Sequence, residues 1–123
     1  MLAKNNRLHK DKEIKSLIHK GQTFFLPEFV IKYQRNQTES KRFSFVISTK
    51  VDKKAVVRNR LKRQLREVAR RLLPDINPGF DILIIAKKQA LDLDFEKLSK
   101  QISFSLVKAR ILKQVSQETK TNK

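Results

Sequence analysis

Near the start of the chain, apolar residues recur at the spacing of a helix. Ile14, Leu17 and Ile18 recur three and four residues apart, so they share one face of a helix. Aspartate is a common helix cap, and glycine commonly ends a helix in the left-handed conformation. The pattern therefore predicts a short helix from Asp11 to Lys20, with Gly21 as its left-handed stop.

Two segments then predict strands. Residues Phe29 to Tyr33 form one, and residues Arg42 to Ser48, in which Phe43, Phe45 and Ile47 alternate with their neighbours, form the other. The preceding apolar segment, Phe24 to Pro27, contains a proline, so it is expected at a sheet edge or in a turn. The polar stretch from Gln34 to Lys41 predicts an exposed hairpin loop between the two strands.

The clearest helical pattern occupies the middle of the chain. Its apolar residues are spaced by four, four, three and four positions, and Pro74 marks its end. These apolar residues are Val57, Leu61, Leu65, Val68 and Leu72.

The segment Phe80 to Ala86 is almost continuously apolar, which is typical of a central strand covered on both faces. Asp92 or Asp94 is expected to cap a last helix from about Phe95 to Gln114. The strands on either side of the central helix could pair in parallel. The order of elements predicts an α+β fold, with three helices on a small mixed sheet. We expect one domain over residues 1–115 and a disordered polar tail over residues 116–123.

The charge balance points to a polyanionic partner. The 123 residues include 29 Lys and Arg against 12 Asp and Glu, a formal charge of +17. Such an excess repels itself unless a polyanion neutralises it. Nucleic acid is favoured, because phosphate contacts release counterions. An anionic membrane is the rival, but the chain has no Trp to anchor an interfacial helix.

Other classes of protein are excluded by composition. The absence of Cys excludes disulfides, thiolate metal sites and a Cys nucleophile. No apolar run approaches the length of a membrane span, and the first 20 residues lack the apolar core of a signal peptide. The cytoplasm is therefore the expected compartment.

The central helix carries most of the functional signal. Residues 53–71 contain nine basic residues and one acid. A solvated helix face usually mixes charges of both signs, so this composition favours a phosphate-binding face over a merely solvated one. On a helical wheel the polar and basic residues lie opposite the apolar stripe. They are Asn59, Lys62, Arg63, Arg66 and Arg70.

No set of residues suited to catalysis is evident in the sequence. His9 and His19 are expected at the surface, and neither phosphate-binding glycine loops nor metal-ligand spacings occur. Asp92 and Asp94 suit helix capping better than acid–base chemistry, and Asp81 has no acidic neighbour in sequence. The chain itself is therefore expected to be catalytically inert.

The segment Arg58-Asn59-Arg60-Leu61-Lys62-Arg63, within residues 55–67, resembles the RNR signature of the bacterial ribonuclease P protein component. Residues Arg42 to Lys50 resemble the family's strand and basic turn, and Asp81 to Lys88 its following strand. Residues Arg7 to Gly21 resemble its start. The resemblance covers most of the chain from Arg7 to about Ile111, in the same order and spacing.

This resemblance implies a fold, a function and partners. The family fold is a two-layer α/β sandwich, a ribosomal-protein-like RNA-binding fold with a left-handed crossover through the RNR helix. Members are the protein subunit of ribonuclease P, an endoribonuclease that removes the 5′ leader of precursor tRNA. The RNA subunit is the catalyst and holds Mg²⁺, while the protein binds no cofactor. The implied partners are ribonuclease P RNA, in a 1:1 complex with one protein monomer, and precursor tRNA, with no membrane.

The resemblance also implies site residues. The cleft for the single-stranded leader lies between the first helix and the sheet, and it maps to Ile14, Ile18, Lys32 and Ser48. Family clefts often have aromatic residues where this chain has Ile14 and Ile18, and both isoleucines are equally compatible with the core. Lys32 is compatible with a phosphate contact or a plain surface position. The RNA subunit would contact Lys50, Lys53, Lys54, Arg58, Asn59, Arg60, Lys62, Arg63 and Arg66.

Three alternatives to this function stay open. A ribosomal or other structural RNA-binding protein of similar charge would not promote cleavage. A DNA-binding transcription factor would place the basic helix in a major groove, usually beside a second helix, whereas strands flank it here. An anionic-membrane protein would bind liposomes at physiological salt.

Overall fold

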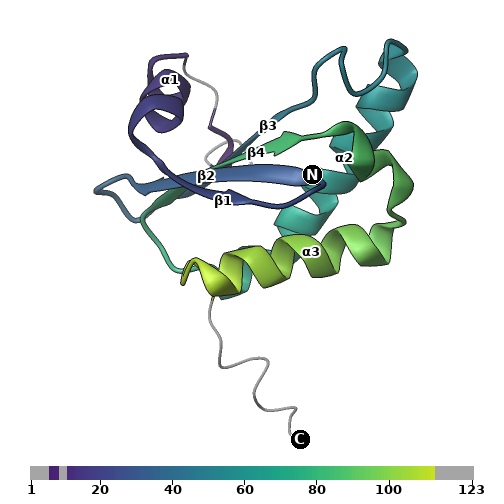
Figure 1. Ribbon diagram of the computed structural model, residues 1–123. Helices are drawn as coiled ribbons and strands as arrows, with labels where there is room; N and C mark the ends of the chain where they lie inside the picture. The colour runs from purple at the N-terminus through teal and green to yellow at the C-terminus, as the bar shows by residue number, and fades with distance from the viewer. Residues whose placement is uncertain (1–5, 9–10, 113–123) are drawn as a thin grey trace, which may run out of the picture.

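The computed structural model describes residues 6–8 and 11–112, so the predicted tail over residues 116–123 lies outside the described residues. Figure 1 shows a sheet with helices against both faces. The elements in chain order are α1 (Asp11–Lys20), β1 (Gln22–Phe25), β2 (Phe29–Arg35), β3 (Lys41–Val46), α2 (Ala55–Leu72), η2 (Leu73–Asp75), β4 (Phe80–Ala86), η3 (Lys88–Asp92) and α3 (Phe95–Lys108).

The four strands form one mixed sheet in the order β1-β2-β4-β3. The most apolar strand, β4, is central as predicted, and β1 with its following Pro27 is at an edge. β2 runs antiparallel to β4, and β3 runs parallel to it. The helix α2 therefore joins two parallel neighbours, which confirms the predicted crossover. Its left-handedness stays a prediction.

The predicted hairpin between β2 and β3 is wrong. Both strands pair with β4, so the loop between them crosses over the start of β4. Asn36 N donates to Gly79 O at 2.8 Å, and Gly79 N donates to Ser40 O at 3.0 Å. Gly79 has a φ of +87°, and a Cβ there would lie 2.9 Å from Thr38 O. β4 lies between β2 and β3, and its nearly continuous apolar sequence suits a strand covered on both faces.

Two separate apolar clusters lie on the two faces of the sheet. On one face, Ile82 and Ile84 of β4 pack with the apolar stripes of α2 and α3. On the other face, Leu83 packs with Leu8 and with Leu17 of α1. The short α1 therefore covers only part of its face (Figure 1), and the fold is the α+β arrangement expected from the sequence.

Two helix ends differ from their predictions. Gly21 follows α1 but has no positive φ, since Gly79 is the one described glycine that does. Glycine is needed at this position because there is no room for a side chain: a Cβ at Gly21 would lie 2.5 Å from Leu17 O. The last helix ends at Lys108 rather than at residue 114. Arg110 takes the left-handed conformation, with a φ of 65°, and turns the chain.

This turn has the Schellman hydrogen bonds, with arginine where glycine is usual. Ile111 N donates to Leu106 O at 2.9 Å, and Arg110 N donates to Val107 O at 3.0 Å. Ile111 and Leu112 are buried immediately after it. Their burial explains why the apolar pattern resembled a longer helix.

Candidate nucleic-acid interface

The helix α2 is amphipathic in the sense predicted. Its inner residues Leu61, Leu65 and Val68 are buried in the main cluster, while Val57 and Leu72 are half-buried. The opposite side carries the polar and basic residues, so the fold fixes a cationic face on a rigid helix packed against the sheet.

Five residues of this face have no hydrogen bond or ion pair within the described part of the chain. Asn59, Arg60 and Arg63 are exposed, and Lys62 and Arg66 are half-buried. Arginine forks bind phosphate oxygens through two bonds, and the Asn amide both donates and accepts. This group, Asn59, Arg60, Lys62, Arg63 and Arg66, is called the free basic face below.

Other cations of α2 are already occupied. Arg70 and Arg71 both donate to Glu67, with Arg71 Nε 2.9 Å from Glu67 Oε2. Hydrogen bonds from Arg70, then Arg71, lower the pKa of the Glu67 carboxyl to about 2. Arg70, predicted to lie on the outward face, is therefore exposed but ion-paired with the one acid of the helix, which it shares with Arg71.

Arg58 has a structural task as well. Its Nη1 donates to the carbonyl oxygens of Asp52 and Lys53, each at 2.9 Å. Asp52 Oδ1 accepts from Lys54 N at 2.8 Å. These bonds hold the basic loop against the start of α2, although Lys54 makes no side-chain cap.

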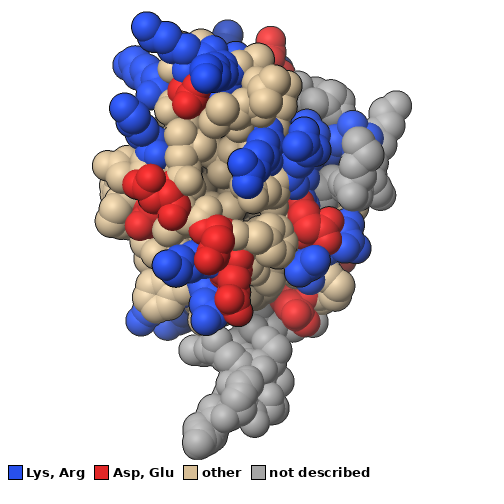
Figure 2. Space-filling model, turned by 90° about the vertical axis from the view of Figure 1, so that its right-hand side faces the viewer, with Lys and Arg blue, Asp and Glu red and all other residues tan. Residues whose placement is uncertain are grey.

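The predicted lysines Lys50, Lys53 and Lys54 are all exposed on this loop. Val51 between them is buried and anchors the segment. In Figure 2 many basic side chains gather in the upper part of the view, where α2 begins, and most of the acidic side chains in this view lie lower. The loop and the free basic face thus form one cationic region.

A partly buried network of ion pairs, missed in the sequence analysis, links α1 to the sheet. Arg42 of β3 contacts Asp81 of β4 through Nε–Oδ1 at 2.9 Å and Nη2–Oδ2 at 3.0 Å. Arg42 Nη1 also reaches Glu13 of α1 at 3.2 Å, and Asn36 Nδ2 donates to Asp81 Oδ1. Hydrogen bonding to Asp81 raises the pKa of Arg42. The sequence did offer a signal for this ion pair, because Asp81 is an acid near the start of a strand that is otherwise apolar and buried.

The sheet face beside α1 carries an open apolar strip. Cross-strand partners share a face, and the pairing register joins one residue from each strand in a row. Of this row, Phe25 is 72% exposed and Val46 is 38% exposed. Ile18 of α1, the helix on this side of the sheet, is 41% exposed. The row is Phe25, Val30, Ile85 and Val46.

The predicted cleft residues do not all belong to this strip. Ile14 is half-buried and packs against the Leu8, Leu17 and Leu83 cluster, whereas Ile18 is open. Lys32 is in the neighbouring row, where its Nζ donates to Thr23 Oγ1 at 2.9 Å. Ser48 lies beyond β3, which ends at Val46, and its Oγ accepts from the Lys50 amide at 3.3 Å.

A cavity of about 290 Å³ links the α1 side of the sheet to α2. Ile14 lines it from α1, and Lys62 and Arg66 line it from the free basic face. The predicted leader cleft and the predicted RNA-binding helix therefore meet around the outer edge of β3.

Two of the acids considered for catalysis have structural partners. Asp94 caps α3 by accepting from Lys97 N at 2.8 Å, and Asp81 is in its ion pair. His19 is exposed, and His9 lies outside the described residues. Across residues 6–8 and 11–112, no group of three His, Cys, Asp or Glu could hold a metal ion, and no helix is long and apolar enough to cross a membrane.

Comparisons with known proteins agree with one another. The family model described as Ribonuclease P matches residues 2–110. The ribonuclease P protein component of Cyanothece sp. is 34% identical over 128 residues, which covers 91% of this chain and 98% of that protein. The Staphylococcus aureus RNase P protein has a TM-score of 0.81 at 25% identity, covering 89% of this chain and 100% of its own. The RNase P protein from Thermotoga maritima has a TM-score of 0.72 at 28% identity, and the match covers 87% of this chain and 98% of that protein.

Proposed function

Because this chain belongs to the ribonuclease P protein family, we propose that it binds the catalytic RNA subunit and the 5′ leader of precursor tRNA. In doing so it supports the endonucleolytic removal of the leader during tRNA maturation. The observation that carries this proposal is the free basic face on α2, in a chain of net charge +17.

The free basic face and the lysine loop suit the RNA subunit. These side chains have no ion pair to break within the described residues, and their helix is already packed on the sheet, so binding to phosphates orders side chains but no backbone. Arg58 contributes by holding Lys53 and Lys54 beside the helix, through its bonds to the carbonyls of Asp52 and Lys53. Contacts through these residues would fix the orientation of the protein on the RNA.

The open apolar strip suits the leader. A single strand has unpaired bases, and bases bind to apolar and aromatic surface largely without regard to sequence. Phe25 is the exposed aromatic on the strip, and Ile18 forms its wall on α1. Lys32, in the neighbouring row, would bind a leader phosphate in place of Thr23 Oγ1.

The chemistry is assigned to the RNA subunit. We propose that Mg²⁺ is bound there and that the protein contributes binding and orientation alone, as one monomer per RNA in the cytoplasm. Exposed His19 and the structural duties of Asp81 and Asp94 support this division.

Reconstitution tests the proposal. The protein is mixed with a ribonuclease P RNA and a precursor tRNA at a Mg²⁺ concentration too low for the RNA alone. Leader release that depends on the protein is the expected result. A protein that binds the RNA without raising cleavage would instead be a structural RNA-binding protein.

A further inference from the structure

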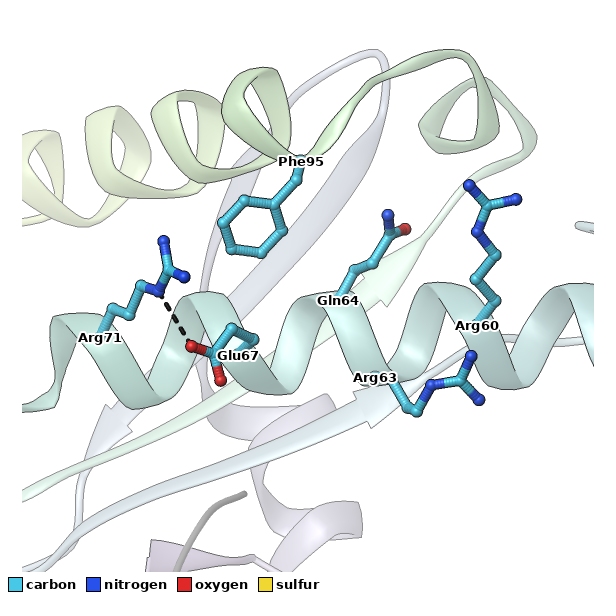
Figure 3. Close-up of a pocket in the computed structure, with 6 residues that line it drawn as sticks. All are labelled: Arg60, Arg63, Gln64, Glu67, Arg71 and Phe95. Carbon is cyan, nitrogen blue, oxygen red and sulfur yellow. Dashed lines mark hydrogen bonds and ion pairs between the residues drawn. The ribbon is translucent and has the colours of Figure 1, made fainter.

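A groove lies on the flank of α2 that faces the start of α3 (Figure 3). Its main cavity has a volume of about 440 Å³. A second cavity of about 280 Å³ adjoins it, because Arg60, Gln64 and Phe95 line both. The groove shares Arg60 and Arg63 with the free basic face, and its other lining residues belong to none of the sites proposed above. The main cavity is lined by Arg60, Arg63, Gln64, Glu67, Arg71 and Phe95.

The aromatic ring of the groove is held in place. Phe95, the first residue of α3, points toward α2 in Figure 3 and is half-buried. The guanidinium of Arg71 lies 4.8 Å from the ring centroid, and Glu67 accepts from Arg71 Nε at 2.9 Å. A ring fixed in this way beside a cationic helix is a stacking surface for a base.

Gln64 supplies an unoccupied polar group beside that ring. In Figure 3 its amide extends from α2 toward α3, between Phe95 and Arg60. It has no hydrogen-bond partner within the described residues. A primary amide offers two donors and an acceptor in one plane, which matches the edge of a nucleobase.

Charge is divided across the groove. Arg60 and Arg63 on α2 are exposed and unpaired within the described residues. Asp94, which lines the adjoining cavity on the opposite side, is exposed and caps α3 by accepting from Lys97 N. A phosphate is therefore attracted to the α2 side and repelled from the α3 side, so a nucleotide would enter with its base toward Phe95.

We propose that this groove binds one unstacked nucleotide of the RNA subunit. The base stacks on Phe95, the Gln64 amide bonds its edge, and Arg60 and Arg63 hold its phosphate. The inference rests on the proposed function, because the partner is the same RNA. It adds a site at which a base stacks on an aromatic ring, which the free basic face does not contain.

Base-specific chemical probing of the reconstituted complex tests the site. Wild type is compared with Phe95→Leu, which keeps apolar packing but loses the ring, and with Gln64→Ala. Phe104→Leu is the matched control, since Phe104 is also an α3 aromatic, is 52% exposed and does not line the groove. Phe95→Tyr retains the ring and serves as the rescue variant. Thermal melting verifies that each variant folds.

The expected result is one base of the RNA protected by wild type, Phe95→Tyr and Phe104→Leu, and exposed in Phe95→Leu and Gln64→Ala. Affinity for the RNA should fall at least about fivefold in Phe95→Leu, the loss expected for one stacking contact. Wild-type binding with unchanged protection in both groove variants would overturn this site and leave the proposed function standing. Failure of wild type to bind the RNA would overturn the proposed function itself.

Discussion

Arg42 and Asp81 meet through two hydrogen bonds of 2.9 Å and 3.0 Å, with only 4% of the Asp81 side chain exposed. The pair joins β3 to β4, and Glu13 extends it to α1. These charged residues therefore help to position α1, which lies on the same face of the sheet as the apolar strip proposed to bind the leader. The arrangement links the stability of the sheet to the shape of a binding surface.

Replacing Arg42 should destabilise the fold. Arg42→Ala leaves the Asp81 carboxylate buried without its partner, and such a loss costs about 3 kcal/mol or more. Chemical denaturation measures the change in the free energy of unfolding. The double variant Arg42→Met/Asp81→Leu, which removes both charges, should recover much of the loss. Equal destabilisation by the double variant would mean that the pair itself contributes the stability.

The ion pairs of Glu67 should give a distinctive pH dependence. Because folding lowers the pKa of Glu67 from 4.5 to about 2, its stabilising contribution is complete above about pH 4.5 and is lost as the pH falls toward 2. NMR titration of the Glu67 carboxyl carbon should give a midpoint near the lower value at low salt. A midpoint near 4.5 would show that Arg70 and Arg71 do not hold the carboxylate in solution.

Free and paired cations of α2 should differ in their effect on RNA binding. Each phosphate contact contributes about 0.7–0.9 to the slope of log affinity against log salt. Arg63→Ala should therefore weaken binding and reduce the slope by about that amount. Arg70→Ala, on the same helix but paired with Glu67, should reduce it less. Titration of RNA binding at several salt concentrations compares the two variants. If both gave the same slope, the phosphate contacts would have to lie elsewhere on the protein.

The two isoleucines of α1 should respond differently to enlargement. Ile18→Phe should fold normally, because Ile18 is 41% exposed, and its ring should tighten binding of long-leader precursor tRNA by about fivefold or more. Ile14→Phe should destabilise the protein, because Ile14 packs against Leu8 and Leu17. Holoenzyme affinity for precursors of graded leader length is the measurement. If Ile18→Phe changed affinity equally at every leader length, Ile18 would not belong to the leader-binding site.

The sequence was sufficient where one periodic pattern dominated. The spacing from Val57 to Leu72 predicted both the buried and the cationic sides of α2. The apolar run of β4 predicted its bounds and its central place. Both predictions rest on burial, which the order of apolar residues encodes directly.

Features that depend on tertiary pairing could not be predicted in the same way. Nothing in the loop after β2 reveals that β4 will separate β2 from β3, because strand order is a property of the whole sheet. The Arg42–Asp81 pair joins residues far apart in sequence. The sequence identifies Arg58 as part of the basic signature but does not reveal that its side chain bonds to the loop before α2. The groove at Phe95 needs the start of α3 beside α2, which periodicity does not specify.

The measurement that tests the central claim most directly is single-turnover cleavage of precursor tRNA by ribonuclease P RNA at low Mg²⁺. Wild-type protein is compared with the variant Arg60→Ala/Lys62→Ala/Arg63→Ala/Arg66→Ala, with folding verified by circular dichroism. We predict that wild type restores leader removal and that the variant requires a far higher protein concentration to reach a similar saturated rate. No stimulation by wild type, or equal stimulation at equal concentration by the variant, would contradict the account.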